Sequence, residues 1–202
     1  MSIQAVIFDF GGALCHFPPR SAFADLGRRA GVDPELFIRT FWGHRIPYDR
    51  GEMTPAEYWS AIGRDTGREF SAAQVEEFRR IDVGFWSDFD LAMIAWADRL
   101  RGAGRKIALL SNLPRDLGEH LRRVDGFLSR FDQVTYSYEV GAVKPEAAIY
   151  KHCLEGLGVE PGSALFLDDR EDNVRGAEAL GVRGFVYGGS RAFAAADFAL
   201  PE

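Results

Sequence analysis

The stretch Ala5-Val6-Ile7-Phe8-Asp9-Phe10-Gly11-Gly12 decides the fold, because it is an apolar run of strand type that ends in a carboxylate and two glycines. In an open parallel sheet the ligand crevice lies beyond the carboxyl ends of the strands. We therefore expect Asp9 at the functional edge of a sheet, followed by a flexible turn. The segment alone also fits an ordinary turn that begins with an aspartate.

Three later segments repeat this pattern of an apolar run followed by polar residues: Ile107–Asn112, Gly141–Glu146 and Ala164–Asp169. Each has an ordinary interpretation, since Ser111 could start a turn, Lys144 could be a surface cation, and Asp168 and Asp169 could be loop acids. Those interpretations do not explain the ordered set of carboxylate, hydroxyl, lysine and acid pair, three of them at strand ends. A parallel sheet brings its strand ends to one edge, so we expect these groups to converge.

Converging groups of these types could transfer a phosphoryl group. Neighbouring carboxylates raise one another's pKa unless a cation joins them, and Mg²⁺ is typically bound by one or two carboxylates together with substrate phosphate. Ser111 and the amides of the Gly11-Gly12 turn could donate to phosphate oxygens, and Lys144 could add a point charge. Asp9 could then attack phosphorus and form an aspartyl phosphate, which divides one displacement into two easier steps.

These motifs, taken in order, resemble the four motifs of the haloacid dehalogenase (HAD) superfamily: Asp9, Ser111-Asn112, Lys144-Pro145 and Asp168-Asp169. The first motif is most similar to that of members with Asp-x-Gly-Gly or Asp-x-Gly-Asn. Those members include sugar-phosphate phosphatases and the amino-terminal domain of epoxide hydrolases. The resemblance runs through nearly the whole chain. The combination is specific for the superfamily but says little about the substrate.

The resemblance implies an α/β fold with a Rossmann-like parallel sheet core at residues 1–16 and 89–202 and an inserted α-helical cap at 17–88. Alternating strand and helix patterns agree with such a sheet. The core pattern predicts strands at 106–110, 133–137, 163–167 and 183–187, and helices ending at Arg101 and at 115–124, 145–157 and 171–180. In the cap it predicts a helix Ser21–Ala30 stopped by Gly31, another from Pro34, and capping boxes at Thr54 and Ser71.

The resemblance also implies a role for each motif residue. Asp9 corresponds to the nucleophile, Ser111 to the phosphate-binding hydroxyl, and Asn112 to the neighbour that shapes the site. Lys144 corresponds to the lysine that steadies the nucleophile and the phosphoryl group. The metal ligands implied are Asp9, Asp168 and the carbonyl of Gly11, with Asp169 either beside the metal ligands or as the partner of the lysine. Phosphate binding includes Gly11 and Gly12.

One position departs from the family pattern. Most phosphatases of the superfamily carry a second aspartate two residues after the nucleophile, as general acid and base, and here that position is Gly11. A glycine has no proton to give, and general acid help is typically worth about 10²–10⁴-fold. We therefore expect a preference for leaving groups that are stable as anions, such as those of aryl phosphates and sugar 1-phosphates.

Within the cap, residues 44–52 mix charged and aromatic groups in a predicted loop. Two interpretations stay open: a solvated turn, or a substrate-reading loop in which His44 and Arg50 bind the substrate. Trp42, Trp59 and Trp86 are expected in the core of the cap, which aromatic side chains dominate.

The whole chain has 202 residues, 47% of them hydrophobic, and a net charge of −6 without long runs of either sign. This excludes a general nucleic-acid binder with a basic face. No signal peptide or membrane span is expected, since no apolar run reaches about 18–20 residues. Two widely spaced cysteines fit a reduced, cytoplasmic protein. We expect a monomer or homodimer.

Three functions follow from these observations. The first is a Mg²⁺-dependent phosphatase of a small phosphorylated metabolite, such as a sugar phosphate. The second is a metal-free dehalogenase that uses Asp9 on carbon. The acid pair Asp168-Asp169 disfavours it, because three acids without a cation repel. The third is a non-catalytic phosphate-binding or scaffold protein, which loss of the acid at Gly11 would favour.

Overall fold

Five parallel strands form one sheet in the order β3-β2-β1-β4-β5. The computed structural model describes residues 2–188 and 195–201, so residues 1, 189–194 and 202 of the expected core lie outside it. The strands are β1 (Ala5–Phe8), β2 (Lys106–Ser111), β3 (Gln133–Tyr136), β4 (Ala164–Asp168) and β5 (Arg183–Val186). The central strand β1 pairs with β2 on one side and β4 on the other, so Asp9 follows the middle of the sheet.

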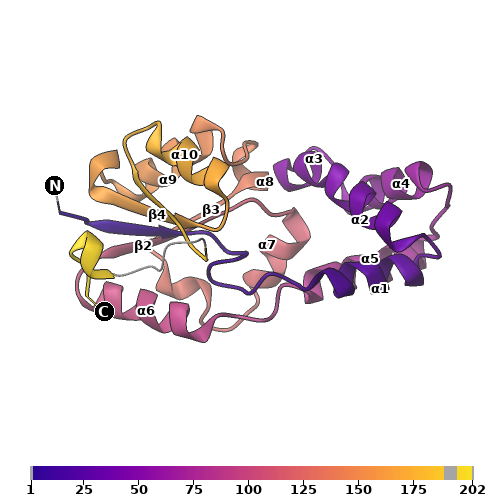
Figure 1. Cartoon of the computed structure of the whole chain (residues 1–202), viewed down its shortest axis with the longest axis horizontal. Helices are drawn as coiled ribbons and strands as arrows, with labels where there is room; N and C mark the ends of the chain where they lie inside the picture. The colour runs from indigo at the N-terminus through magenta and orange to yellow at the C-terminus, as the bar shows by residue number, and fades with distance from the viewer. Residues whose placement is uncertain (1, 189–194, 202) are drawn as a thin grey trace.

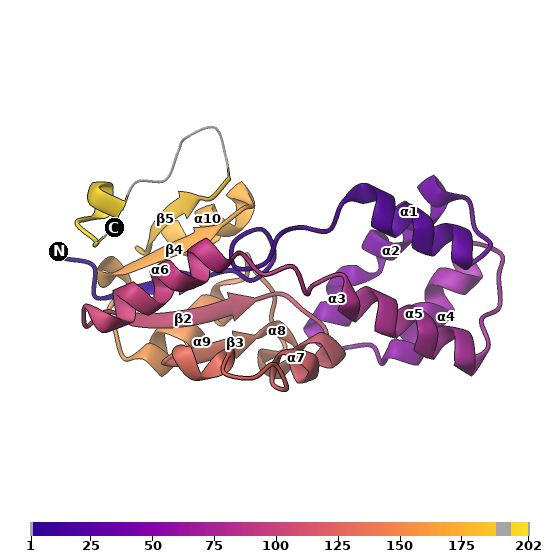
Figure 2. The ribbon, with the colours of Figure 1, turned by 90° about the horizontal axis from the view of Figure 1, so that it is seen from below.

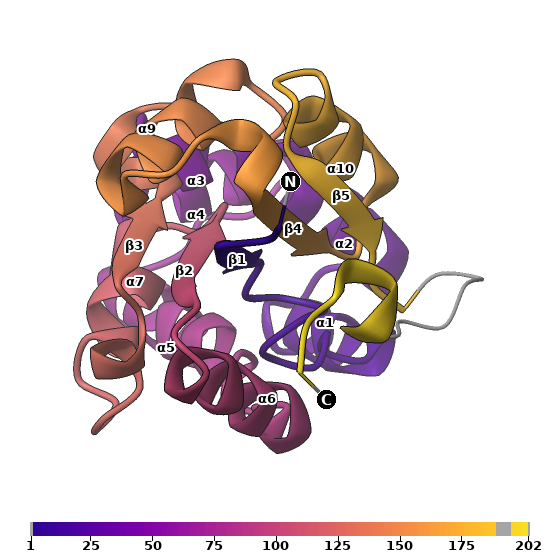
Figure 3. The same ribbon diagram turned by 90° about the vertical axis from the view of Figure 1, so that its left-hand side faces the viewer.

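Helices cover both faces of this sheet (Figure 3). They are α6 (Leu91–Gly102), α7 (Arg115–Leu121), α8 (Ser137–Val140), α9 (Ala147–Leu157) and α10 (Glu171–Glu178), with short 3-10 turns at Leu128–Arg130, Pro161–Ser163 and Ala195–Phe198. Val6 and Phe8 pack in the hydrophobic cluster that includes α6 and α7, whereas Ala5 and Ile7 pack in the one that includes α9 and α10. Strands covered on both faces are apolar throughout, which explains the continuous apolar runs. The α/β prediction is confirmed.

A block of five helices lies beyond the carboxyl ends of the strands (Figures 1 and 2). Its helices are α1 (Arg20–Arg29), α2 (Pro34–Gly43), α3 (Arg45–Arg50), α4 (Pro55–Asp65) and α5 (Ala72–Gly84). Both predicted capping boxes are present, with Thr54 capping α4 and Ser71 capping α5. Among the helices of residues 2–188 and 195–201, none has both the length and the apolar character that crossing a bilayer requires.

The loop prediction for residues 44–52 is wrong, because Arg45–Arg50 forms helix α3 and Gly51 ends it in the left-handed conformation, with φ 82°. The buried side chains of this helix are Arg45, Tyr48 and Asp49, so the usual apolar spacing is absent. Arg45 donates to Asp49 one turn later at 2.9 Å, and both side chains are buried. Buried ion pairs therefore stabilise a segment whose composition is typical of a solvated turn.

Helix α3 joins the helical block to the core. The hydroxyl of Ser137 in α8 donates to the backbone carbonyl of Asp49 at 2.5 Å. Arg50 reaches Glu146 in the turn before α9, with nitrogen–oxygen distances of 2.8 and 2.9 Å. Forked contacts between a guanidinium and a carboxylate fix orientation as well as distance.

A buried charge cluster lies beside these contacts. Arg45 donates to Asp82 at 2.9 Å as well as to Asp49, and Tyr48 donates to Asp116 of α7 at 2.9 Å. Burial raises the pKa of Asp49 to about 6, although Arg45 opposes the shift. The cluster connects the core to α3 and α5 through groups that are costly to leave without partners.

The chain enters and leaves the helical block at one place. The amide of His16 donates to the carbonyl of Asp88 at 2.8 Å, and the amide of Asp90 donates to the carbonyl of Leu14 at 2.9 Å. Cys15 and Phe89 form an antiparallel bridge between them. The two linkers are therefore held side by side at the edge of the sheet.

Candidate active site

The ammonium of Lys144 lies between two carboxylates. Its Nζ atom is 2.7 Å from Oδ1 of Asp9 and 2.6 Å from Oδ2 of Asp168, and it also donates to the carbonyl of Leu110 at 3.2 Å. Lys144 and the two aspartates are buried. Asp9 follows β1 and Asp168 ends the neighbouring strand β4. The structure thus brings the residues of three sequence motifs into contact.

Asn112 holds the segment that carries Lys144. Its Oδ1 atom accepts from the backbone amide of Lys144 at 2.8 Å, and its Nδ2 atom donates to the carbonyl of the same residue at 3.1 Å. The preceding residue, Ser111, ends β2 and is buried. These reciprocal bonds fix the lysine relative to the end of β2.

Asp168 is oriented by donors from the turn that follows β4. It accepts from the amide of Arg170 at 2.8 Å and from Nδ2 of Asn173 at 3.0 and 3.1 Å. Sequence analysis gave no role to Asn173. Its position in the turn and helix that follow the strand-ending acid is the signal that points to it.

Three carboxyl groups meet at this site beside the ammonium of Lys144. Oxygens of Asp9, Asp168 and Asp169 lie within 4.8 Å of one another, and the ammonium of Lys144 contacts two of these carboxylates, Asp9 and Asp168. Burial raises the pKa of Asp9 to about 8. Lys144 opposes this shift, and Asp168 and Asp169 add to it. Burial would also raise the pKa of Asp168, but Lys144, Arg170 and Asn173 hold it below its usual range. A set of carboxylate oxygens with surplus negative charge fits Mg²⁺.

A glycine is required at position 12 because of the backbone conformation there and because the side chain of Asp169 lies close to it. Its φ is +81°, and a Cβ there would lie 2.6 Å from Cγ of Asp169. Its amide, expected to donate to phosphate, donates to the carbonyl of Cys15 at 2.7 Å. The glycine therefore lets the turn pass close to Asp169.

Gly11 lies against the ring of Trp86. A Cβ at Gly11 would be 2.8 Å from Cζ3 of the indole, and the φ of Gly11 is outside the left-handed region. Trp86 was predicted in the core of the cap, but it packs in the hydrophobic cluster of the sheet, which includes Phe10. That prediction is wrong, because the linker after α5 returns along the first linker and carries the indole to the turn after β1.

The two residues predicted to bind the substrate lie in different surroundings. His44 is at the junction of α2 and α3, and its Nε2 atom is 2.8 Å from Oδ2 of Asp65 in α4. Arg50 contacts Glu146, which is two residues after Lys144. The structure thus brings Arg50 to the segment that carries Lys144, and holds His44 within the helical block.

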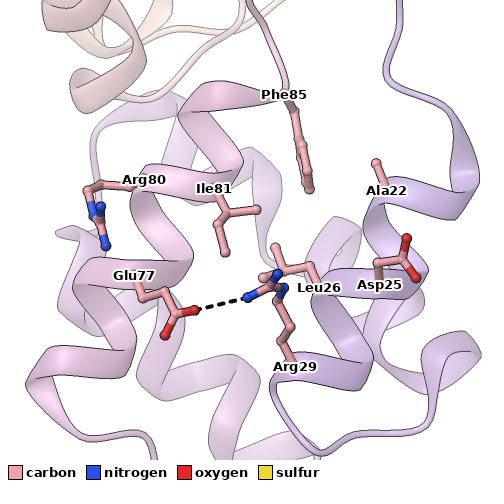
Figure 4. Close-up of a pocket in the computed structure, with 8 residues that line it drawn as sticks. All are labelled: Ala22, Asp25, Leu26, Arg29, Glu77, Arg80, Ile81 and Phe85. Carbon is pink, nitrogen blue, oxygen red and sulfur yellow. Dashed lines mark hydrogen bonds and ion pairs between the residues drawn. The ribbon is translucent and has the colours of Figure 1, made fainter.

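A separate groove of about 550 Å³ lies between α1 and α5, where Arg29 and Glu77 form an ion pair of 3.4 Å (Figure 4). All its lining residues belong to the helical block or the linker after it: Ala22, Asp25, Leu26, Arg29, Glu77, Arg80, Ile81 and Phe85. None of the predicted site residues is among them.

Comparison with known proteins identifies the class. The family model of haloacid dehalogenase-like hydrolases matches residues 3–181. The chain is 31% identical over 193 residues to the phosphatase MT3486 of Mycobacterium tuberculosis (strain CDC 1551 / Oshkosh), covering 92% of this chain and 88% of that protein. The protein belongs to the haloacid dehalogenase-like hydrolases, as its four motifs predicted.

Two further matches extend over most of the chain. The sesquiterpene phosphatase astK of Aspergillus oryzae is 25% identical over 187 residues, covering 91% of this chain and 89% of that protein. The solved structure of a HAD-family enzyme from Bacteroides thetaiotaomicron, in complex with magnesium and inorganic phosphate, superposes with a TM-score of 0.77. That match is 24% identical and covers 94% of this chain and 97% of the other, and it supports the fold.

Proposed function

We propose that the protein is a Mg²⁺-dependent phosphatase of a small phosphorylated metabolite, and that Asp9 forms an aspartyl phosphate. The observation that carries the proposal is the contact of Lys144 with both Asp9 and Asp168 at a three-carboxylate edge. A metal-free attack on carbon would leave this surplus negative charge without a counterion. Phosphatases are also named among the proteins to which the chain is similar.

The proposed reaction has two displacements. A carboxylate oxygen of Asp9 attacks phosphorus, and the bond between phosphorus and the ester oxygen breaks. The ester oxygen departs with the bonding electrons as an alkoxide or phenolate and takes its proton from water. Water then attacks the aspartyl phosphate, which releases inorganic phosphate and regenerates the carboxylate. Lys144 holds Asp9 in place and stabilises negative charge on the phosphoryl oxygens, and the Ser111 hydroxyl donates to one of them.

Asp9, Asp168, Asp169 and the carbonyl of Gly11 would hold Mg²⁺. When bound there, the ion supplies positive charge to the phosphoryl oxygens and to the carboxylates. The donor set consists of oxygens alone, which suits this ion. The Bacteroides thetaiotaomicron neighbour was solved with magnesium and inorganic phosphate, in keeping with this proposal.

Residues 17–88 act in this proposal as a cap over the site, with 1–16 and 89–202 as the catalytic core. The cap would exclude water and contact the leaving group, as lids over active sites do. Arg50, which pairs with Glu146, would act near the phosphoryl group. His44 would act from farther inside the cap. Both cysteines are free and buried, which is compatible with a cytoplasmic location.

A chemical trap tests the proposal. The enzyme, with Mg²⁺ present, is mixed with acetyl phosphate or 1-naphthyl phosphate, quenched in acid and analysed by peptide mass spectrometry. We expect the mass of one phosphoryl group on the peptide that contains Asp9. The Asp9→Asn variant should keep its circular dichroism spectrum, carry no label and release no phosphate. Turnover of 2-haloacids in the presence of a chelator, without phosphatase activity, would instead support the dehalogenase alternative.

A further inference from the structure

The space beside Gly11 is filled by an aromatic ring. Because the φ of Gly11 is outside the left-handed region, its backbone is not what excludes a side chain. The obstacle is Cζ3 of Trp86, 2.8 Å from where a Cβ would be. Trp86 is only 7% exposed, and its indole nitrogen has no hydrogen-bond partner among the residues that the structure describes. The ring therefore contributes its apolar surface at this position, and no polar contact of its own.

A second aromatic side chain extends this apolar surface to solvent. Phe17, in the linker before α1, meets Trp86 edge-on with ring centroids 5.4 Å apart and stacks on Trp42 at 5.9 Å. It is 53% exposed, although it has a third aromatic neighbour in Phe23 at 6.4 Å. The two linkers thus present adjoining aromatic rings next to the turn that follows Asp9.

The direction of the reaction places the leaving group on this side. In an in-line displacement the leaving oxygen departs opposite to the attacking oxygen. Asp9 follows the end of β1, and the strands point toward the helical block (Figures 1 and 2). A leaving group on a phosphorus attacked by Asp9 therefore extends toward the linkers and the helical block, where Phe17 and Trp86 lie.

The polar cap residues predicted to bind the substrate are already paired with other side chains. His44 pairs with Asp65, and Arg50 pairs with Glu146 and Glu52. A sugar hydroxyl that reaches them would have to displace an existing ion pair. An aromatic ring needs only the exposed face of Phe17, and aromatic pairs gain about 0.5–1.5 kcal/mol beyond their area burial.

We propose that Phe17 and Trp86 determine the specificity of this site for phosphate monoesters of aromatic alcohols. The proposal rests on the phosphatase function proposed above and names its substrate class. A phenol with a pKa of about 10, as in tyrosine, leaves as phenolate without a proton from the enzyme. The phenolate then takes its proton from water. A leaving group that needs no proton from the enzyme suits a site in which Trp86 excludes an acidic side chain at position 11.

A comparison of substrates across variants tests this proposal. Values of kcat/KM are measured for 1-naphthyl phosphate, glucose 1-phosphate and acetyl phosphate, the last of which has a good leaving group without a ring. For the wild-type protein we expect naphthyl phosphate to exceed glucose 1-phosphate by about tenfold or more. Phe17→Ala should lower the ratio of naphthyl to acetyl phosphate about three- to tenfold. The control Leu91→Ala removes another exposed apolar side chain, on α6, and should leave the ratio unchanged.

A second arm examines the contact between Gly11 and Trp86. Gly11→Asp alone should lose activity on every ester, because the new side chain meets the indole. Gly11→Asp combined with Trp86→Ala should regain glucose 1-phosphate turnover relative to Trp86→Ala alone. If Trp86→Ala does not fold by circular dichroism, Trp86→Leu takes its place, and the Phe17 comparison stands by itself.

The outcomes separate the two proposals. Failure to release phosphate from any of the three compounds would overturn the phosphatase function. Phosphate release with glucose 1-phosphate equal to or better than naphthyl phosphate, or a ratio that Phe17→Ala does not change, would overturn only the aromatic specificity. Full activity of the single Gly11→Asp variant would contradict the role given to Trp86.

Discussion

Nζ of Lys144 lies 2.7 Å from Oδ1 of Asp9, although one residue follows the first strand and the other precedes α9. The same ammonium contacts Asp168 at 2.6 Å. Each carboxylate in this buried site therefore depends on a charge that comes from elsewhere in the chain.

Replacement of Lys144 by Met should lower kcat about 10²–10³-fold, as removal of a preorganised electrostatic group at an active site does. The ammonium lowers the pKa of Asp9, so its removal should also move the acidic limb of the pH–rate profile to higher pH. A pH–rate profile of the variant measures both effects. Lys151→Met, an exposed substitution on α9, is the control. A variant at Lys144 with wild-type kcat would remove the lysine from the mechanism.

Asp168→Asn should raise the Mg²⁺ concentration needed for half-maximal activity at least tenfold, since it replaces a charged ligand by a neutral one of the same shape. Chelation should stop the wild-type enzyme, and added Mg²⁺ should restore it. Metal titrations followed by activity and by calorimetry measure the change. The control is Asp172→Asn, an exposed acid in the first turn of α10. An unchanged Mg²⁺ requirement in the Asp168 variant would contradict the proposed metal set.

Gly12→Ala should cost activity through Asp169, since the added methyl group would lie 2.6 Å from Cγ of that residue and φ is +81°. A non-glycine residue in this conformation costs about 1–2 kcal/mol. The midpoint temperature of thermal unfolding and the affinity for Mg²⁺ should therefore both decrease. Gly43→Ala is the matched control, because it stands in a helix with no atom within 4 Å of the new methyl group. Equal behaviour of the two variants would show that the turn tolerates a side chain.

The pKa of Asp49, raised by burial to about 6, gives a pH dependence of stability. The folded protein binds the proton of the Asp49 carboxyl more tightly than the unfolded chain does, because aspartates in the unfolded chain have a pKa of about 4. The contribution of Asp49 to the free energy of unfolding should therefore fall as the pH rises from about 4 to about 6, by at most about 3 kcal/mol. Urea denaturation of the wild type and Asp49→Asn across this range measures it. The difference in unfolding free energy, wild type minus variant, should be larger at the acidic end, and a constant difference would contradict the shift.

Arg50→Ala and His44→Ala should differ in their effects on turnover. Arg50 contacts Glu146 beside the segment of Lys144, whereas His44 contacts Asp65 inside the helical block. We expect Arg50→Ala to raise KM about threefold to tenfold, because it removes a forked contact between the block and the core. His44→Ala should change KM less than twofold. Steady-state kinetics with 1-naphthyl phosphate provide the comparison, and a larger effect at His44 would reverse the assignment.

The strands and the catalytic edge could be predicted from the sequence because their signals are local. Apolar runs ending in Asp9, Ser111 and Asp168 mark strands, and parallel topology brings their ends to one edge. Most predicted boundaries agree with the structure within about two residues, although α7 ends at Leu121 rather than 124. The helix expected at residue 145 begins at Ala147.

The features that sequence reasoning missed depend on contacts between distant segments. Helix α3 is stabilised partly by Arg45 and Asp82, which are 37 positions apart, and no local pattern indicates such a partner. The contact of Trp86 with Gly11 likewise forms only because two linkers pair. Composition alone placed Trp86 with the other cap tryptophans, where aromatic side chains are common.

Because the two linkers pair, the helical block is an insertion that could be removed from the chain without changing the connections between the strands. Leu14 and Asp90 are already hydrogen-bonded neighbours, so a short turn between them would close the chain without moving any strand. The insertion therefore starts and finishes at the same point, and its length does not alter the strand order. A lineage could exchange or resize the helices of this block while Asp9, Lys144 and Asp168 stay where they are.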